Sequence, residues 1–261
     1  MAGSCHIRGF GACMIGGFPH RQEDSFFHHA VERLRQETGQ DIVDSLFTMG
    51  GFPVTRVPRH FHARCLAAEP DIVVLQFGSS DLVVPVRHRP QASSSISVQR
   101  HVSARRATAL DRLNWQVRSL IGDGLRLTPV TPPDKYLETM LLLTQTLVEH
   151  QVIPVVLSPF VFGSRRSDRL ARDCGVRLQQ SLAALPFAFY VDAYAALDGK
   201  PRERMLLRDG AHLSLAGQQV VAETLYPTLK NLVDSRGGSR KALHRRLETG
   251  LAAVRLPCSP T

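Results

Sequence analysis

The chain has 261 residues, of which 43% are hydrophobic and 21% charged, and its formal net charge is +9 at pH 7. This balance is typical of a globular protein and argues against intrinsic disorder. No run approaches the ~20 apolar residues of a membrane-spanning helix. The N-terminal residues lack the positive-then-apolar pattern of an export signal, so we expect a cytoplasmic protein with no membrane span.

The cysteines favour neither a disulfide framework nor a zinc site. There are five, at positions 5, 13, 65, 174 and 258, and no two form a C-x-x-C pair. An odd number of widely spaced cysteines is best interpreted as a set of separate thiols. We therefore expect no metal and no cofactor.

Strand and helix patterns alternate along the chain. A strand is expected over 5–12 and then a helix over 22–38, whose apolar positions Phe26, Phe27, Ala30, Val31 and Leu34 share one face. Further strands are expected over 42–48, 71–77, 152–157 and 187–191. Two further helices are expected over 105–121 and 166–184. Two more are expected to begin at a capping residue, one from Asp134 through His150 and one from Ser214 to Val233.

Strands that are separated by helices of this length indicate an α/β fold, a parallel sheet covered on both faces. No repeat is visible and no linker divides the core. We expect one domain over 1–235, interrupted by a polar, Ser-rich and basic excursion at 86–106. A basic tail follows at 236–261.

Polar and glycine-rich segments follow the first three strands. They are Gly11-Ala12-Cys13, Gly50-Gly51, and Gly78-Ser79-Ser80-Asp81. The carboxyl ends of parallel strands are where the reactive groups of such sheets gather. The loop that holds Asp209 and His212 can close on the same edge, so four separate segments are predicted to converge on one site.

Asp209-Gly-Ala-His212 is the most informative of these segments, because it supplies a carboxylate three residues before an imidazole at the start of the last helix. Such a pair provides a general base and the acid that orients it. The predicted nucleophile is Cys13, whose thiol a neighbouring histidine can convert to the reactive thiolate.

These four segments, in this order, resemble the SGNH/GDSL hydrolase superfamily over about residues 5–233. Cys13 stands where that family has serine, and Ser80 stands where it has asparagine. The resemblance implies a three-layer α/β/α sandwich and acyl-transfer chemistry. It also implies oxyanion donors at the Cys13 backbone, at Gly51 (or Gly50) and at the Ser80 side chain. Serine is shorter than asparagine, and losing one oxyanion donor costs roughly 10²–10³ in rate.

The predicted function is that of an acyl-transfer enzyme, an esterase, thioesterase or acyltransferase. It would use a Cys13-His212-Asp209 triad and an acyl-thioester intermediate. Its substrate would be a small acyl ester or thioester, with an acidic acyl-carrier protein or the phosphates of a CoA thioester as a further partner of the basic residues. A catalytically inactive binding module is the alternative.

The basic residues form two clusters, which in the alternative would dock an acidic protein or nucleic acid. A simpler interpretation is solvated charge. No aromatic residues interleave with these clusters, which argues against nucleic acid. The clusters are Arg87, Arg89, Arg100, Arg105 and Arg106 with His88 and His101, and Arg236, Arg240, Lys241, Arg245, Arg246 and Arg255.

Structural roles compete with the functional ones at several positions. Cys13 is also consistent with a small buried residue, and Asp209 with a hydrogen bond that caps the last helix. Asp81 fits an Asx turn as well as a site residue. Cys65 and Cys174, in helical segments, are expected to be core or surface thiols. His60 and His62 have no partner cluster that would make them a metal site.

Overall fold

The computed structural model describes residues 4–84, 107–124, 128–160, 162 and 164–235. The 86–106 excursion and the 236–261 tail lie outside this part of the chain. Five parallel strands form one sheet in the order β2-β1-β3-β4-β5. They are β1 (Cys5–Gly11), β2 (Ile42–Thr48), β3 (Ile72–Gln76), β4 (Ile153–Leu157) and β5 (Phe189–Val191).

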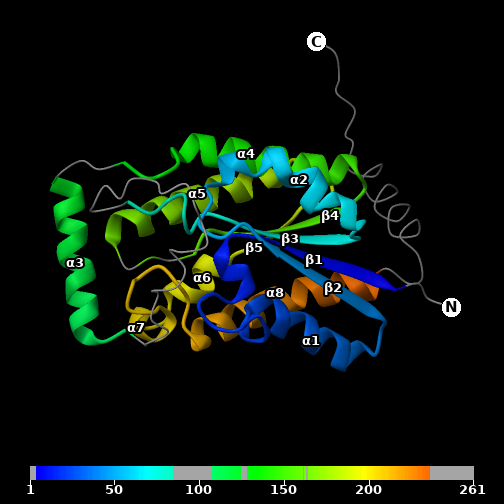
Figure 1. Ribbon diagram of the computed structural model, residues 1–261, viewed down its shortest axis with the longest axis horizontal. Coiled ribbons are helices and arrows are strands. Elements are labelled where there is room, and N and C mark those ends of the chain that lie inside the picture. Colours follow the sequence, from blue (N-terminus) through cyan, green and yellow to red (C-terminus); the bar gives the residue numbers. More distant parts are fainter. Residues whose placement is uncertain (1–3, 85–106, 125–127, 161, 163, 236–261) are drawn as a thin grey trace, which may run out of the picture.

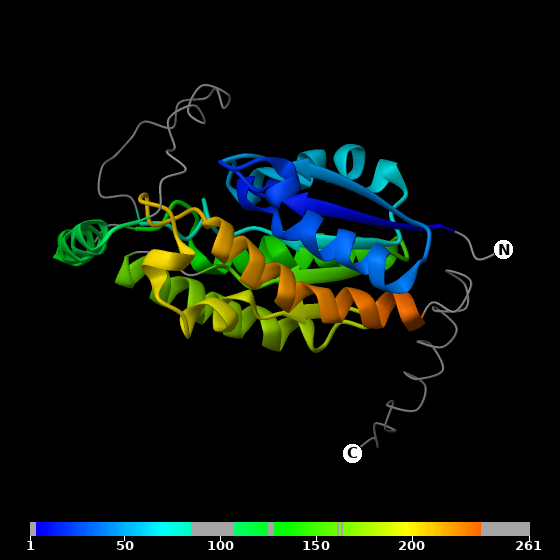
Figure 2. The ribbon, with the colours of Figure 1, turned by 90° about the horizontal axis from the view of Figure 1, so that it is seen from below.

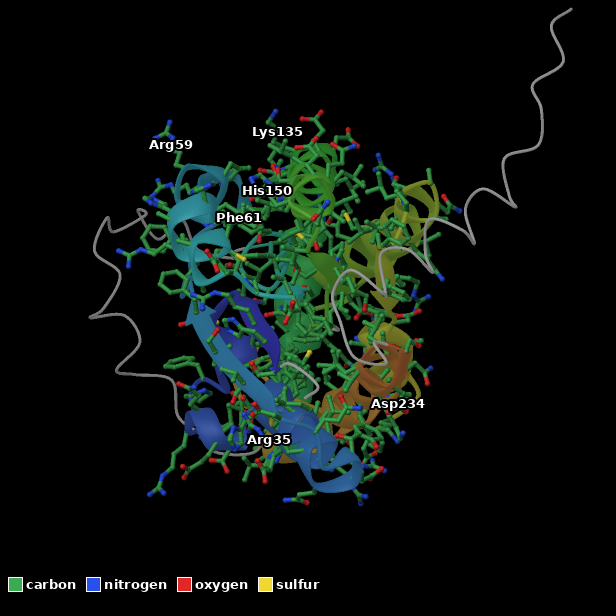
Figure 3. All side chains as sticks on the ribbon, turned by 90° about the vertical axis from the view of Figure 1, so that its right-hand side faces the viewer. Arg35, Arg59, Phe61, Lys135, His150 and Asp234 are labelled. Carbon is green, nitrogen blue, oxygen red and sulfur yellow. The ribbon has the colours of Figure 1, made fainter. Side chains whose placement is uncertain are left out.

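The helices are α1 (Phe26–Thr38), α2 (Pro58–Arg64), α3 (Ala109–Gly124), α4 (Pro133–Glu149), α5 (Arg165–Leu182), α6 (Ala193–Asp198), α7 (Arg202–Met205) and α8 (Leu215–Ser235). Helices α1 and α8 cover one face of the sheet, and α2, α4 and α5 lie on the other (Figure 1). Figure 2 looks onto the face that α1 and α8 cover, with the strands behind them. Figure 3 shows Arg35 and Asp234 on the α1/α8 side, with Phe61 and His150 on the opposite side. The expected three-layer α/β/α fold is therefore confirmed.

Strand β1 lies inside the sheet, between β2 and β3, so its carboxyl end opens between two other strand ends. Gly11 is paired with Gln76 of β3, and a Cβ atom at Gly11 would lie only 2.3 Å from the Gln76 carbonyl oxygen. Glycine is required there because any side chain would collide with backbone. Phe10, next to it, packs edge-on against Phe61 of α2, with ring centroids 5.3 Å apart. This contact ties the end of β1 to the helical layer.

All five predicted strands are present, and each boundary agrees within two residues. The predicted helix over 22–38 begins later, at Phe26, because Ser25 accepts a hydrogen bond from the His28 backbone and caps the helix there. Its five apolar positions are all buried, as expected. The short helices α2, α6 and α7 were not predicted, because one or two turns give too little periodicity to detect.

The two predicted caps differ in outcome. Ser214 accepts a hydrogen bond from the Gly217 backbone at 3.1 Å, at the start of α8, so this cap is confirmed. Asp134 does not cap α4, because the helix already begins at Pro133, with Pro132 in the cap position. Its carboxylate instead pairs with Arg177 of α5 at 2.7 Å. Within the described residues, no helix is long and apolar enough to cross a membrane.

Candidate active site

Cys13 is the first residue of a short 3-10 helix (Cys13–Gly16) that begins just beyond β1. The Ala12 N–H donates to the Gln76 carbonyl oxygen at 2.8 Å, which extends the pairing with β3 up to the cysteine. A helix's first backbone N–H groups have no acceptor within the helix. The Cys13 amide therefore stands at a position where it can donate to a ligand. The thiol is nearly enclosed, with 9% of the residue's surface exposed.

The loop from Asp209 to His212 is held in place from both sides. Its ends are joined by the hydrogen bond from the Leu207 N–H to the His212 carbonyl oxygen, 2.8 Å long. Within the loop, one oxygen of the Asp209 carboxylate accepts the backbone N–H groups of Ala211 (2.9 Å) and His212 (3.0 Å). The carboxylate thus forms a turn that fixes the loop backbone.

The other oxygen of Asp209 lies 2.5 Å from Nδ1 of His212. The opposite ring nitrogen, Nε2, lies 3.3 Å from the Sγ of Cys13. The structure therefore brings together the three side chains of the predicted triad, although Cys13 and His212 are 199 residues apart in the chain. A carboxylate, an imidazole and a thiol in this sequence can relay one proton between sulfur and nitrogen while the carboxylate keeps the ring in one orientation.

The environment of His212 favours its charged form. Burial on its own lowers the pKa of the imidazole, but the hydrogen bonds to Asp209 and Cys13 outweigh it and raise the pKa to about 10. For Asp209, burial would raise the pKa of the carboxyl, but the hydrogen bonds from His212 and from the loop backbone bring it below its usual value. At neutral pH the structure favours an imidazolium between a carboxylate and the sulfur, and such a cation stabilises a thiolate.

This charge state predicts a specific titration. We expect His212 to remain an imidazolium at pH 8 in the wild type, because its pKa is raised above that pH, and to become neutral at pH 8 when Asp209 is replaced by asparagine. Ring nitrogen chemical shifts measured by NMR between pH 5 and 11 test this. The chain has eleven histidines, so the signal is assigned by its loss in His212→Gln. A titration near pH 6.5 in the wild type would contradict the expectation.

The remaining predicted site residues lie in loops that follow β2 and β3. Ser80 donates its hydroxyl hydrogen to the carbonyl oxygen of Phe52 at 3.3 Å, which joins these two loops. Gly51 is exposed, and a Cβ atom there would have no neighbour within 4 Å. Gly50 beside it has a φ of 57°, a conformation that favours glycine. The roles of Ser80 and Gly51 as oxyanion donors stay predictions.

Asp81 is a structural residue of this edge. It is fully buried, and its carboxylate accepts hydrogen bonds from the Val54 N–H at 2.7 Å and from the Thr131 hydroxyl at 2.8 Å. A third, from the Gly78 N–H at 3.3 Å, closes the turn after β3. Asp81 thus connects the loops after β2 and β3 with the start of α4. Burial raises the pKa of its carboxyl, and these hydrogen bonds oppose the rise.

Cys65, Cys174 and His62 take structural roles. Both Cys65 and Cys174 are buried, and burial raises the pKa of their thiols to about 12 and about 11. Neither supplies thiolate at neutral pH. His62 packs its ring edge-on against His150. Among the described residues, no group of three or more histidine, cysteine or acidic side chains is placed to hold a metal ion.

Three residues at the site were not predicted. The Phe18 ring packs edge-on against His212, with centroids 5.2 Å apart, and Nε2 of His20 lies 3.3 Å from the Leu213 carbonyl oxygen. Trp115 of α3 donates its indole N–H to the Arg208 carbonyl oxygen at 3.0 Å. For Phe18 and His20 the sequence signal was Gly16-Gly17, a glycine pair that indicates a turn just after Cys13 and so brings the following residues back toward it. Trp115 carried none, because its partners are about 93 residues away.

No protein-family model and no curated protein sequence matches the chain. Solved structures do match. A lipase/acylhydrolase from Enterococcus faecalis aligns with a TM-score of 0.61 and 14% identity, over 87% of this chain and 96% of that one. TesA aligns with a TM-score of 0.59 and 17% identity, over 87% and 99%. The esterase EstA from Pseudoalteromonas aligns at 0.56 and 13%, over 88% and 98%.

These similarities establish the fold. The chain has the α/β/α fold of the GDSL-type lipases and esterases, and it spans nearly the whole length of each of these structures. At such low identity the shared architecture does not transfer a substrate or a set of functional residues.

Proposed function

We propose that this protein is an acyl-transfer enzyme, an esterase, thioesterase or acyltransferase, in which Cys13 is the nucleophile. The observation that carries the proposal is the continuous contact from Cys13 Sγ through His212 to Asp209, with distances of 3.3 Å and 2.5 Å. This contact lies at the carboxyl end of β1, and the carboxyl ends of parallel strands are where reactive groups gather in such folds. Cys13 has this histidine beside its Sγ, whereas burial raises the pKa of the Cys65 and Cys174 thiols.

In the first half of the reaction the thiolate of Cys13 attacks the carbonyl carbon of an ester or thioester. The carbonyl oxygen takes the electron pair and becomes an oxyanion, which the backbone N–H of Cys13 is positioned to receive by its place at the start of the 3-10 helix. When the carbonyl re-forms, the bond to the leaving group breaks. His212 gives its Nε2 proton to the departing oxygen or sulfur, and an acyl thioester remains on Cys13.

In the second half, water or another acceptor attacks this thioester. His212, now neutral, takes the acceptor's proton, and Cys13 leaves as the thiolate that began the cycle. Asp209 keeps its charge throughout and stabilises the imidazolium. A thioester passes its acyl group to amines and thiols as well as to water, so Cys13 in place of serine favours transfer or thioester chemistry alongside hydrolysis.

Gly51 completes the proposal as a further oxyanion donor, and Ser80 can add another only when its hydroxyl releases the Phe52 carbonyl oxygen. A small acyl ester or thioester is the substrate class. The neighbours in fold that are described as lipases and esterases support this class. An acidic acyl-carrier partner rests on the basic clusters, which lie outside the described residues. An inactive binding module is the outcome to expect if Cys13 does not react.

The proposal is tested by mass spectrometry of the intact protein after brief exposure to a p-nitrophenyl acyl ester. We expect the wild type to gain the mass of one acyl group. Cys13→Ala should gain none, because it lacks the thiol, and His212→Ala should gain it far more slowly, because thiolate is no longer stabilised. Cys174→Ala is the matched control, since burial raises the pKa of its thiol to about 11 and its loss should leave the adduct unchanged.

The fate of the adduct then distinguishes hydrolysis from acyl transfer. Discharge by water alone indicates an esterase or thioesterase, and faster discharge by an added amine or thiol indicates a transferase. Equal labelling of the wild type and the His212 variant, or an adduct that survives the loss of Cys13, would overturn the proposed triad in favour of a binding module.

A further inference from the structure

A cavity lined by Trp115 lies next to the Asp209–His212 loop. Its volume is about 420 Å³, and its walls come from α3, α5 and α7. We refer to it as the arginine cavity, because four arginines line it, together with one carboxylate and one large aromatic ring. These residues are Arg165, Arg169, Arg172, Arg202, Asp168 and Trp115.

The positive charge of the arginine cavity follows from helix geometry. Arg165, Arg169 and Arg172 are spaced by four and three residues at the beginning of α5, so their side chains share one face of the helix. Ser164 caps this helix by accepting a hydrogen bond from the Ser167 N–H. The dipole of the helix adds further positive potential at its N-terminal end.

The only carboxylate among the lining residues is already neutralised. Asp168 is buried, and it pairs with Arg202 at 2.6 Å and accepts a hydrogen bond from the Tyr194 hydroxyl at 3.2 Å. Arg172 donates to the same hydroxyl at 3.0 Å and pairs with Asp198 of α6 at 3.2 Å. These contacts fix the guanidinium groups of Arg172 and Arg202 in place before any ligand binds.

Arg169 is different from these two. Its side chain is exposed, and within the described part of the chain it makes neither a hydrogen bond nor an ion pair. A guanidinium group without a partner, beside two that are held in position, is suited to bind a phosphate group through paired N–H donors. Four arginines against two carboxylates, Asp168 and Asp198, leave a positive charge that favours an anionic ligand over a neutral one.

Trp115 contacts both the arginine cavity and the loop of the candidate active site. One side of the residue lines the cavity, while its indole N–H binds the Arg208 carbonyl oxygen. A Cβ atom at Gly210, between Asp209 and His212, would lie only 2.8 Å from the same nitrogen. Helices α3 and α7 lie at the end of the molecule away from the N-terminus, the end toward which β1 runs (Figure 1).

We propose that the arginine cavity binds a phosphate group of the acyl ester or thioester substrate while the acyl carbonyl lies at Cys13. The position of the acyl carbonyl at Cys13 rests on the proposed function. The position of the phosphate rests on the arginine cavity alone. It assigns the substrate to the phosphate-bearing acyl esters and thioesters. The phosphate is a handle for binding and takes no part in the reaction.

Binding is tested first, and independently of catalysis, in the full-length Cys13→Ala protein. Pyrophosphate is titrated in by calorimetry at low and at physiological salt. We expect binding that weakens with salt, and a Kd that rises about 10-fold in Arg169→Gln, since the exposed guanidinium is a direct donor to the anion. Arg177→Gln is the matched control, because it lies on the same helix but pairs with Asp134 outside the cavity.

Kinetics then distinguish a substrate phosphate from free phosphate. With catalytically intact Cys13, Arg169→Gln should lower kcat/KM about 10-fold for acetyl-CoA and leave it unchanged for the neutral thioester S-acetyl-N-acetylcysteamine. Equal effects on both thioesters, with pyrophosphate binding retained, would overturn the substrate assignment and leave a free-phosphate site. No pyrophosphate binding, or equal loss in Arg177→Gln, would overturn the cavity as an anion site. An absent acyl adduct on Cys13 would refute the proposed function while leaving the calorimetric result intact.

Discussion

Replacing Asp209 with asparagine is expected to lower kcat for a p-nitrophenyl acyl ester by about 10³- to 10⁴-fold, with little change in KM. The amide oxygen can still accept the Ala211 and His212 backbone N–H groups, so the loop should keep its shape. The amide nitrogen, however, replaces the oxygen that faces Nδ1 of His212. It donates where the imidazole must also donate, which favours the wrong tautomer and removes the charge that stabilises the imidazolium.

Asp192→Asn is the matched control for this effect. Asp192 likewise accepts a backbone N–H from a residue shortly after it in the chain, because the Ala195 N–H donates to its carboxylate at 2.9 Å and this bond caps α6. Its replacement should change kcat by less than twofold. A loss below 10-fold in Asp209→Asn, or a comparable loss in Asp192→Asn, would show that Asp209 serves only to shape the loop. The two effects are measured as initial rates over a range of substrate concentrations at pH 7.

The order of segments along the chain was enough to predict the sheet and the meeting of Cys13 with His212. Both follow from the order of strand and helix patterns along the chain, since parallel strands place their carboxyl ends at one edge of the sheet. Asp209 and His212 are three residues apart, so their contact is local. In contrast, Trp115 of α3 packs against Gly210 in a loop 95 positions further along the chain, and no local sequence pattern marks this contact.

The arginine cavity illustrates the same limit. The sequence drew attention to basic clusters at 87–106 and 236–255, because they are dense there. The arginines of α5 are diluted by neighbouring acids, and Arg202 comes from another helix. Their convergence on one cavity depends on the tertiary fold. Ion pairs with nearby carboxylates decide which of these arginines can still bind an anion, and the amino-acid composition does not show these pairs.

The two loops that would complete an oxyanion site are already joined to each other. Ser80 donates its hydroxyl hydrogen to Phe52, and Asp81 beside it accepts the Val54 N–H. A serine hydroxyl has a single hydrogen, so this contact leaves none for an oxyanion. The backbone groups of Cys13 and of the loop after β2 would then have to act without a donor from position 80, and the acylation rate of the wild type should be limited accordingly.

Substituting Ser80 with asparagine is therefore expected to raise kcat for a p-nitrophenyl acyl ester by about 10²-fold, the size of the effect that one oxyanion donor has in such sites. The amide is one atom longer than the hydroxymethyl group and carries two N–H hydrogens, so it can reach further and keep a bond to the Phe52 carbonyl oxygen. Ser80 is partly exposed, which leaves room for the longer side chain. The rate of acyl-adduct formation on Cys13, measured by mass spectrometry, should rise in parallel.

Ser80→Asp separates the donor effect from a change of shape. Aspartate has nearly the same outline as asparagine, but it carries no N–H group and its charge opposes an oxyanion, so its rate should fall below that of the wild type. Ser80→Ala should stay within a few-fold of the wild type, because the native hydroxyl is engaged with Phe52. Equal rates for the asparagine and aspartate variants would mean that position 80 does not reach the carbonyl oxygen, and that the backbone donors stabilise the oxyanion by themselves.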